Sequence, residues 1–176
     1  DELKNEITKT TPASFEPSID YVVTKIPRFT FEKFSTSEAI LGTSMKSVGE
    51  AMAIGRNFKE SLQKALVSLE IGFSGLDRIF PLNTKEIEKE LRKNIPNRIL
   101  LVAEAFRKKI NIKRIHQLCK IDPWFLEQIK EIVDEENQIQ KQGLPKDYNE
   151  FNRIKSIGFS DKKLSEITKI SEDIVR

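Results

Sequence analysis

Two segments in the first third of the chain have the residue patterns of β-strands. Residues 19–26 are rich in β-branched and aromatic side chains, and Pro27 ends this strand or confines it to a sheet edge. Residues 47–55 are the second segment. Its alternation places four side chains on one face: Val48, Glu50, Met52 and Ile54. A carboxylate therefore shares a row with three apolar side chains.

The pattern changes to a helical period after residue 56. Asn57 can cap a helix, with Glu60 three residues later as the partner of a capping box. Apolar residues then recur at helical spacing along one stripe: Phe58, Leu62, Ala65, Leu66 and Leu69. These positions predict a helix that buries this stripe.

Residues 70–176 show helical patterns almost throughout. We expect Thr84 to cap a short helix and Pro96 to open a longer one. Asp122 followed by Pro123 is typical of a helix N-terminus and predicts a helix of about 15 residues. The apolar stripe of that helix contains Phe125, Ile129, Ile132 and Val133. Shorter helices follow.

Composition excludes several classes of protein. The 30 Lys and Arg residues against 27 Asp and Glu leave a net charge of +3, which gives no general attraction to nucleic acid or anionic membrane. No apolar run reaches the roughly 18 residues of a membrane span. A single cysteine cannot form an internal disulfide, and the start at Asp1 resembles neither a signal nor a transit peptide. We expect a segment of a longer, cytoplasmic protein.

Two short motifs could carry chemistry, and each has a simpler structural explanation. His116 and Cys119 have the spacing of two metal ligands on a helix, but the chain has no other His or Cys to complete a zinc site. Gly72 and Gly75 follow a helix and lack both a Walker lysine and a G-x-G-x-x-G pattern. A helix C-terminus with a turn explains them better than a phosphate-binding loop.

Residues 158–176 predict two short capped helices joined by a tight turn, as in a DNA-binding helix-turn-helix. A recognition helix begins with Arg, Lys, Asn or Gln. Here the second helix begins with Ser171, Glu172 and Asp173, whose charges would repel phosphates. We keep a helical nucleic-acid-binding module as the alternative function and expect no nucleic-acid partner.

Glu50 has two interpretations when only the residues are considered. A β-bulge at Gly49 would turn the carboxylate to solvent. Without a bulge, the carboxylate would face an internal cavity or passage. The pattern leaves both open.

Several long blocks of this chain closely resemble the large subunit of carbamoyl phosphate synthetase. The specific blocks are residues 11–29, 31–34, 45–56 and 60–66, and looser ones follow in the same order at 98–99, 103–107, 121–126 and 157–161. The chain departs from the family by a short deletion around Lys9 and Thr10 and in the variable loop 35–42. The resemblance covers almost the whole chain.

The resemblance implies a mainly α protein with a small α/β part. Residues 1–69 would be the end of the carboxyphosphate-forming ATP-grasp domain, and residues 70–176 an all-helical oligomerisation domain. The parent ligase would make carbamoyl phosphate from bicarbonate, glutamine-derived ammonia and two ATP, for arginine and pyrimidine biosynthesis. Its ATP and Mg²⁺ (or Mn²⁺) would bind elsewhere, so this fragment would bind no cofactor, hold no catalytic or metal-ligating residue and be inactive alone.

The resemblance also implies partners and site residues. The partners would be the rest of the large subunit, the glutaminase small subunit and a second copy through residues 70–176, with no membrane contact. Met45 and Glu50, with Ser37, match positions that line the family's carbamate tunnel, which favours the cavity interpretation of Glu50. For the adjacent Trp124 and Phe125, we expect both to be core residues, with Phe125 on the apolar stripe.

Overall fold

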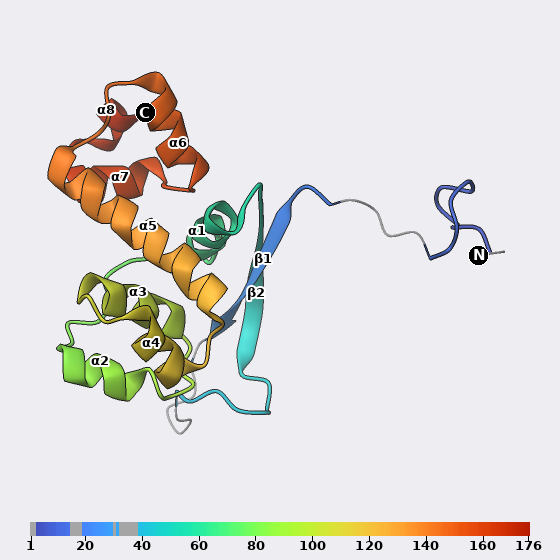
Figure 1. Cartoon of the computed structure of the whole chain (residues 1–176), viewed down its shortest axis with the longest axis horizontal. Helices are drawn as coiled ribbons and strands as arrows, with labels where there is room; N and C mark the ends of the chain where they lie inside the picture. Colours follow the sequence, from blue (N-terminus) through green and yellow to red (C-terminus); the bar gives the residue numbers. More distant parts are fainter. Residues whose placement is uncertain (1–2, 15–18, 30, 32–38) are drawn as a thin grey trace.

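The computed structural model describes residues 3–14, 19–29, 31 and 39–176, and it is mainly α-helical with a small antiparallel sheet, as expected (Figure 1). The elements in chain order are β1 (Val22–Phe29), β2 (Ser47–Gly55), α1 (Phe58–Ser68), α2 (Thr84–Glu90), α3 (Arg98–Arg107), α4 (Ile112–Cys119), α5 (Pro123–Gln142), α6 (Tyr148–Ser156), α7 (Asp161–Thr168) and α8 (Glu172–Val175).

Strands β1 and β2 pair as an antiparallel hairpin. Strand β2 matches the predicted segment 47–55, whereas β1 starts three residues later than the predicted 19–26 and extends to Phe29. The pairing runs from Val22 opposite Gly55 to Arg28 opposite Gly49, and Phe29 then pairs with Ser47. One residue of β2, Val48, is therefore extra, so a bulge lies beside Gly49. Strand β1 continues through Pro27 because both strands of a two-stranded sheet are edges, where a missing N–H is tolerated.

Helix α1 begins where the sequence predicts. The Asn57 side chain accepts a hydrogen bond from Glu60 N at 2.9 Å. The Glu60 carboxylate reaches back one residue further than in a capping box and accepts from Arg56 N at 2.7 Å. Leu62, Ala65 and Leu66 of the predicted stripe are buried, which confirms the buried face.

The helices after residue 83 form the main body, in which α5 runs from the α2–α4 group to the α6–α8 group (Figure 1). Helix α3 is buried on nearly all sides over 100–106. Two helices start one or two residues away from their predicted positions. Asn83, not Thr84, caps α2 by a reciprocal capping box with Glu86, and α3 starts at Arg98 rather than Pro96.

Helix α5 spans 20 residues, more than expected, and ends before Gly143. Leu62, Leu66 and Leu69 belong to the same hydrophobic core as the later helices, so α1 is packed into the main body. The division into residues 1–69 and 70–176 stays a prediction. No helix in the described part of the chain is long and apolar enough to cross a membrane.

Candidate functional site at the hairpin and the buried polar clusters

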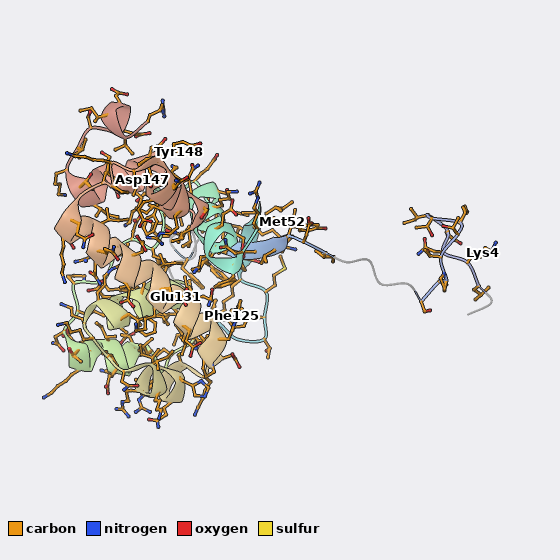
Figure 2. All side chains as sticks on the ribbon, turned by 45° about the horizontal axis from the view of Figure 1, so that its top comes forward. Lys4, Met52, Phe125, Glu131, Asp147 and Tyr148 are labelled. Atoms are coloured by element: carbon orange, nitrogen blue, oxygen red, sulfur yellow. The ribbon has the colours of Figure 1, made fainter. Side chains whose placement is uncertain are left out.

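Glu50 lies on β2 opposite Pro27 and forms an ion pair across the hairpin with Lys25. Lys25 Nζ lies 2.8 Å from Glu50 Oε1, and both side chains are more than half exposed. Met52 (labelled in Figure 2) and Ile54 are exposed like Glu50 and alternate with less exposed residues of β2, which confirms the predicted row. An ion pair this exposed contributes about 0–1 kcal/mol to stability.

A cavity of about 1150 Å³ separates one end of the hairpin from the helices. Its walls are formed by residues within 26–29, 48–51, 66–73 and 95–100 and by Phe31, Ala39 and Phe80. Most of these side chains are apolar, and the charged residues are Arg28, Glu50 and Glu70. The structure thus places Glu50 at the cavity wall while its carboxylate reaches Lys25 on the exposed face.

The other two predicted site residues are not brought together with Glu50. Met45 precedes β2 and is 88% exposed. It does not belong to the described lining of the cavity. Ser37 lies outside the described residues. Their role in a passage stays a prediction that concerns a longer protein.

His116 and Cys119 have local structural roles. The ring nitrogen Nδ1 of His116 lies 2.7 Å from Ile121 O, just after α4. Cys119 is 4% exposed and part of the core. Among the described residues, no group of three His, Cys, Asp or Glu side chains could hold a metal ion.

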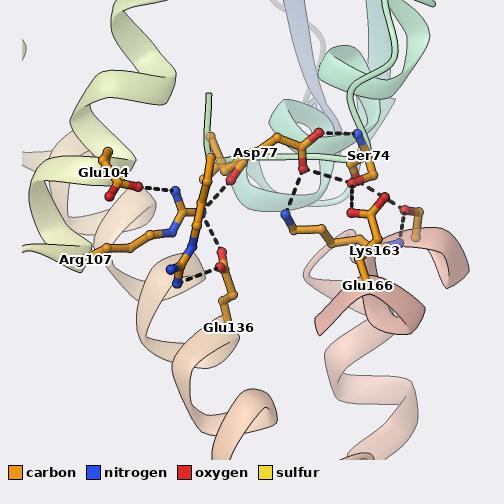
Figure 3. A network of polar contacts seen from close by, with 10 residues as sticks. Ser74, Asp77, Glu104, Arg107, Glu136, Lys163 and Glu166 are labelled. Carbon is orange, nitrogen blue, oxygen red and sulfur yellow. Dashed lines mark hydrogen bonds and ion pairs between the residues drawn. The ribbon is translucent and has the colours of Figure 1, made fainter. Parts of the chain in front are cut away.

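A buried charge cluster joins α3, α5 and the loop before α2 (Figure 3). Arg107 Nη2 lies 2.6 Å from Glu136 Oε2, and Arg107 Nη1 lies 3.3 Å from Glu104 Oε2. These three side chains are less than one-tenth exposed. Arg107 also donates to Leu76 O, and Arg78 approaches Glu136 to 3.5 Å. Sequence reasoning missed this cluster.

A second polar cluster fixes the loop of Gly72 and Gly75 to α7 (Figure 3). Asp77 accepts from Ser74 N at 2.7 Å and from Lys163 Nζ at 2.7 Å. Ser74 Oγ lies 2.7 Å from a carboxylate oxygen of Glu166. The Asp77 carboxylate therefore occupies the donors that a bound phosphate would need, which favours the predicted turn over a phosphate loop.

Replacing Asp77 by Asn is expected to destabilise the fold by about 1.5–3 kcal/mol at neutral pH, because charge-assisted bonds are lost and the buried Lys163 is left unpaired. Burial acts to raise the pKa of the Asp77 carboxyl, but hydrogen bonds from Lys163 and Ser74 outweigh it and lower the pKa below its ordinary value. The contribution of Asp77 is therefore present above the unfolded-state pKa and is lost as pH falls through the lower, folded-state pKa.

Urea unfolding of the wild type and of Asp77→Asn between neutral pH and about pH 3 measures this contribution. The difference between the two proteins should shrink as pH falls. Glu150→Gln is a matched control, because Glu150 also pairs with a cationic side chain, Arg153, but on an exposed surface. A pH-independent difference for Asp77→Asn would contradict the assignment.

The tail does not present a basic recognition surface. Helices α7 and α8 are joined as predicted, but Lys163 on α7 is 6% exposed and paired with Asp77. Helix α8 has four residues and begins with Glu172 and Asp173. These features do not support the nucleic-acid-binding alternative.

Trp124 and Phe125 are not core residues, contrary to expectation. Trp124 is 51% exposed and Phe125 is 42% exposed. Both contact Phe58 of α1, with ring centroids 5.7 and 5.2 Å away. Phe125 lies at the N-terminal end of α5 (Figure 2). The apolar stripe begins instead at Leu126, which is fully buried. Phe58, Trp124 and Phe125 form an aromatic cluster at the surface, in which Phe58 is partly buried against the core.

Comparison with known proteins gives consistent matches along the chain. A profile described as "Carbamoyl-phosphate synthetase large chain, oligomerisation domain" matches residues 50–176. The carbamoyl phosphate synthase large chain of Brucella melitensis is 52% identical over 184 residues, covering 100% of this chain and 16% of that protein. The corresponding protein of Campylobacter jejuni is 52% identical over 174 residues, covering 99% and 16%. The chain therefore spans about one-sixth of the length of these relatives.

Proposed function

Because the chain belongs to the carbamoyl phosphate synthetase large-chain family, we propose that it forms part of a ligase of that family. The parent enzyme would make carbamoyl phosphate from bicarbonate, glutamine-derived ammonia and two ATP, for arginine and pyrimidine biosynthesis. The chain would act as a scaffold between the domains of the large subunit, which would associate with a glutaminase small subunit.

Exposed apolar side chains on the hairpin carry the scaffold proposal. Val23, Met52 and Ile54 are 45%, 63% and 53% exposed on one face of a two-stranded sheet. A hairpin with an uncovered apolar face is marginally stable by itself and needs a packing partner. Segments of the much longer parent chain would provide that cover if, as we propose, the hairpin belongs to an ATP-grasp domain.

The chemistry would take place in other parts of the parent. The described residues hold neither a carboxylate cluster suited to Mg²⁺ or Mn²⁺ nor a nucleotide loop. We propose no catalytic or cofactor-binding residue for the isolated chain. Saturable, bicarbonate-dependent ATP hydrolysis by the purified chain would contradict this assignment.

Glu50 and Met45, with Ser37, would line part of a carbamate passage in the parent enzyme. The position of Glu50 at the cavity wall supports this role. Met45 lies two residues before β2, so its side chain would narrow the entrance rather than the cavity itself.

Residues 70–176 would also associate with a second copy of the chain, as the description of the matching profile suggests. We expect sedimentation velocity of the purified chain to show concentration-dependent dimers in the micromolar range. Trp124→Ala should weaken them more than Tyr148→Ala, because exposed Trp side chains packed in a cluster are frequent interface anchors. A chain that stays monomeric at high micromolar concentration would contradict association through this segment alone.

A further inference from the structure

Helix α1 is fixed to the hairpin by contacts that leave little free space. The hydroxyl groups of Thr24 and Ser61 lie 2.7 Å apart, and Lys64 Nζ donates to Ile54 O at 3.3 Å. A Cβ atom on Gly55 would come within 2.7 Å of Ser61 N. The base of the hairpin therefore cannot shift against α1 without breaking these contacts.

The opposite side of α1 is fixed to the turn between α6 and α7. Gln63 is 1% exposed, and its Nε2 donates to Ile157 O at 3.0 Å. Gly158 in the same turn has φ +101°, and a Cβ there would lie 2.9 Å from Glu60 Cα. Figure 1 shows α1 between the hairpin and the C-terminal helices. A side chain and a backbone carbonyl that lie 94 residues apart in the sequence thus help to hold one helix in place.

The cavity leaves the far end of the hairpin without such close support. On one side, the cavity is lined by hairpin residues within 26–29 and 48–51. On the other side, it is lined by residues within 66–73 and 95–100 of the helical part of the chain. Of the described helices, α1 is the one that packs extensively on both strands. The position of Glu50 at this end therefore depends on where α1 holds the hairpin.

From these contacts we infer that Gln63 and Gly158 are positioning residues for the hairpin. They hold α1 against the turn between α6 and α7, and α1 in turn holds β2 so that Glu50 keeps its place at the cavity. A change in the C-terminal helices would then move the hairpin although those helices do not form its sheet. The functional consequence rests on the proposed role of Glu50 in the passage.

Amide hydrogen exchange of the full-length protein tests whether Gln63 and Gly158 hold the hairpin in position. Gly158→Ala forces α1 away from the turn, so we expect amides of Val22–Phe29 and Ser47–Gly55 to exchange about ten-fold faster. Gly143→Ala is the matched control, because Gly143 also has a positive φ of 78° but open space around its Cβ position. The hairpin of this control should exchange at the wild-type rate.

Gln63→Met removes the hydrogen bond to Ile157 O with little change in side-chain volume. This variant still tests the positioning role if Gly158→Ala does not fold. It should accelerate exchange in the same hairpin amides by a smaller factor. Unchanged hairpin exchange in Gln63→Met, or an equal increase in Gly143→Ala, would overturn the positioning role.

Assays of the same full-length variants separate this inference from the proposed function. If the hairpin exchanges faster and overall carbamoyl phosphate synthesis falls more than the separate half-reactions, both ideas hold. If the hairpin amides exchange faster but overall carbamoyl phosphate synthesis is unchanged, the positioning role is supported and the passage role of Glu50 is refuted. Reduced synthesis with unchanged exchange would overturn the positioning role.

Discussion

Replacing Arg107 by Met is expected to lower the free energy of unfolding by about 3–5 kcal/mol, a large part of the stability of a typical domain. The guanidinium lies between the carboxylates of Glu104 and Glu136 and is itself 3% exposed. Its removal leaves Glu104 without a described charge partner, while Glu136 keeps Arg78 at 3.5 Å. An uncompensated buried carboxylate costs more than the intact cluster contributes.

Urea denaturation followed by circular dichroism measures this loss at neutral pH. Arg114→Met is the matched control, because Arg114 pairs with Glu88 on the surface and its side chain is 44% exposed. The control should unfold at nearly the wild-type urea concentration. Adding Glu104→Gln to Arg107→Met should restore part of the stability, because the unpaired charge is then removed. Equal destabilisation by the two arginine variants would contradict a special role for burial.

The hairpin and α1 could be predicted because their signals are local. A period of two placed Glu50, Met52 and Ile54 in one row, and the Asn57 cap located the start of α1. Pro27 was more permissive than it looked, since an isolated pair of strands has no central position that requires its N–H. Local patterns thus sufficed for the separate strands and for the start of α1, which depend on residues close together in the sequence.

The buried charge cluster was missed because its members are distant in the sequence. Glu104 and Arg107 have the i,i+3 spacing of an exposed helical ion pair. One signal was nevertheless available. Apolar residues surround Glu104 on nearly every side of α3, which indicates a buried helix. Charged residues inside such a helix need partners, although the sequence does not say that Glu136 is one.

The interpretation of Phe125 failed for a different reason. Phe125 and Leu126 are adjacent and equally apolar, and the period of α5 admits either as the first residue of the buried stripe. The choice depends on α1, because Phe58 lies against Phe125 at the surface while Leu126 enters the core. Tertiary packing, not periodicity, decided between the two.

In the full-length enzyme, Glu50→Ala is expected to reduce overall carbamoyl phosphate synthesis on the order of ten-fold while the half-reactions stay largely intact. In the proposed parent enzyme, the half-reactions would be bicarbonate-dependent ATP hydrolysis and ATP formation from carbamoyl phosphate. The proposed role of the Glu50 carboxylate is to keep the passage polar and hydrated. Met45→Phe should likewise reduce overall synthesis more than the half-reactions, because the bulkier ring would narrow the entrance of the proposed passage.

Two controls distinguish the passage from the stability of the hairpin. Lys25→Met removes the 2.8 Å ion pair but keeps the carboxylate, so overall synthesis should stay near the wild-type level. Glu50→Gln keeps the size and polarity of the side chain, and it should lose less activity than Glu50→Ala. All three rates are measured at saturating substrates on the same preparations. If the two half-reactions fell together with overall synthesis in Glu50→Ala, the residue would be structural. The carbamate would then not pass along this face of β2.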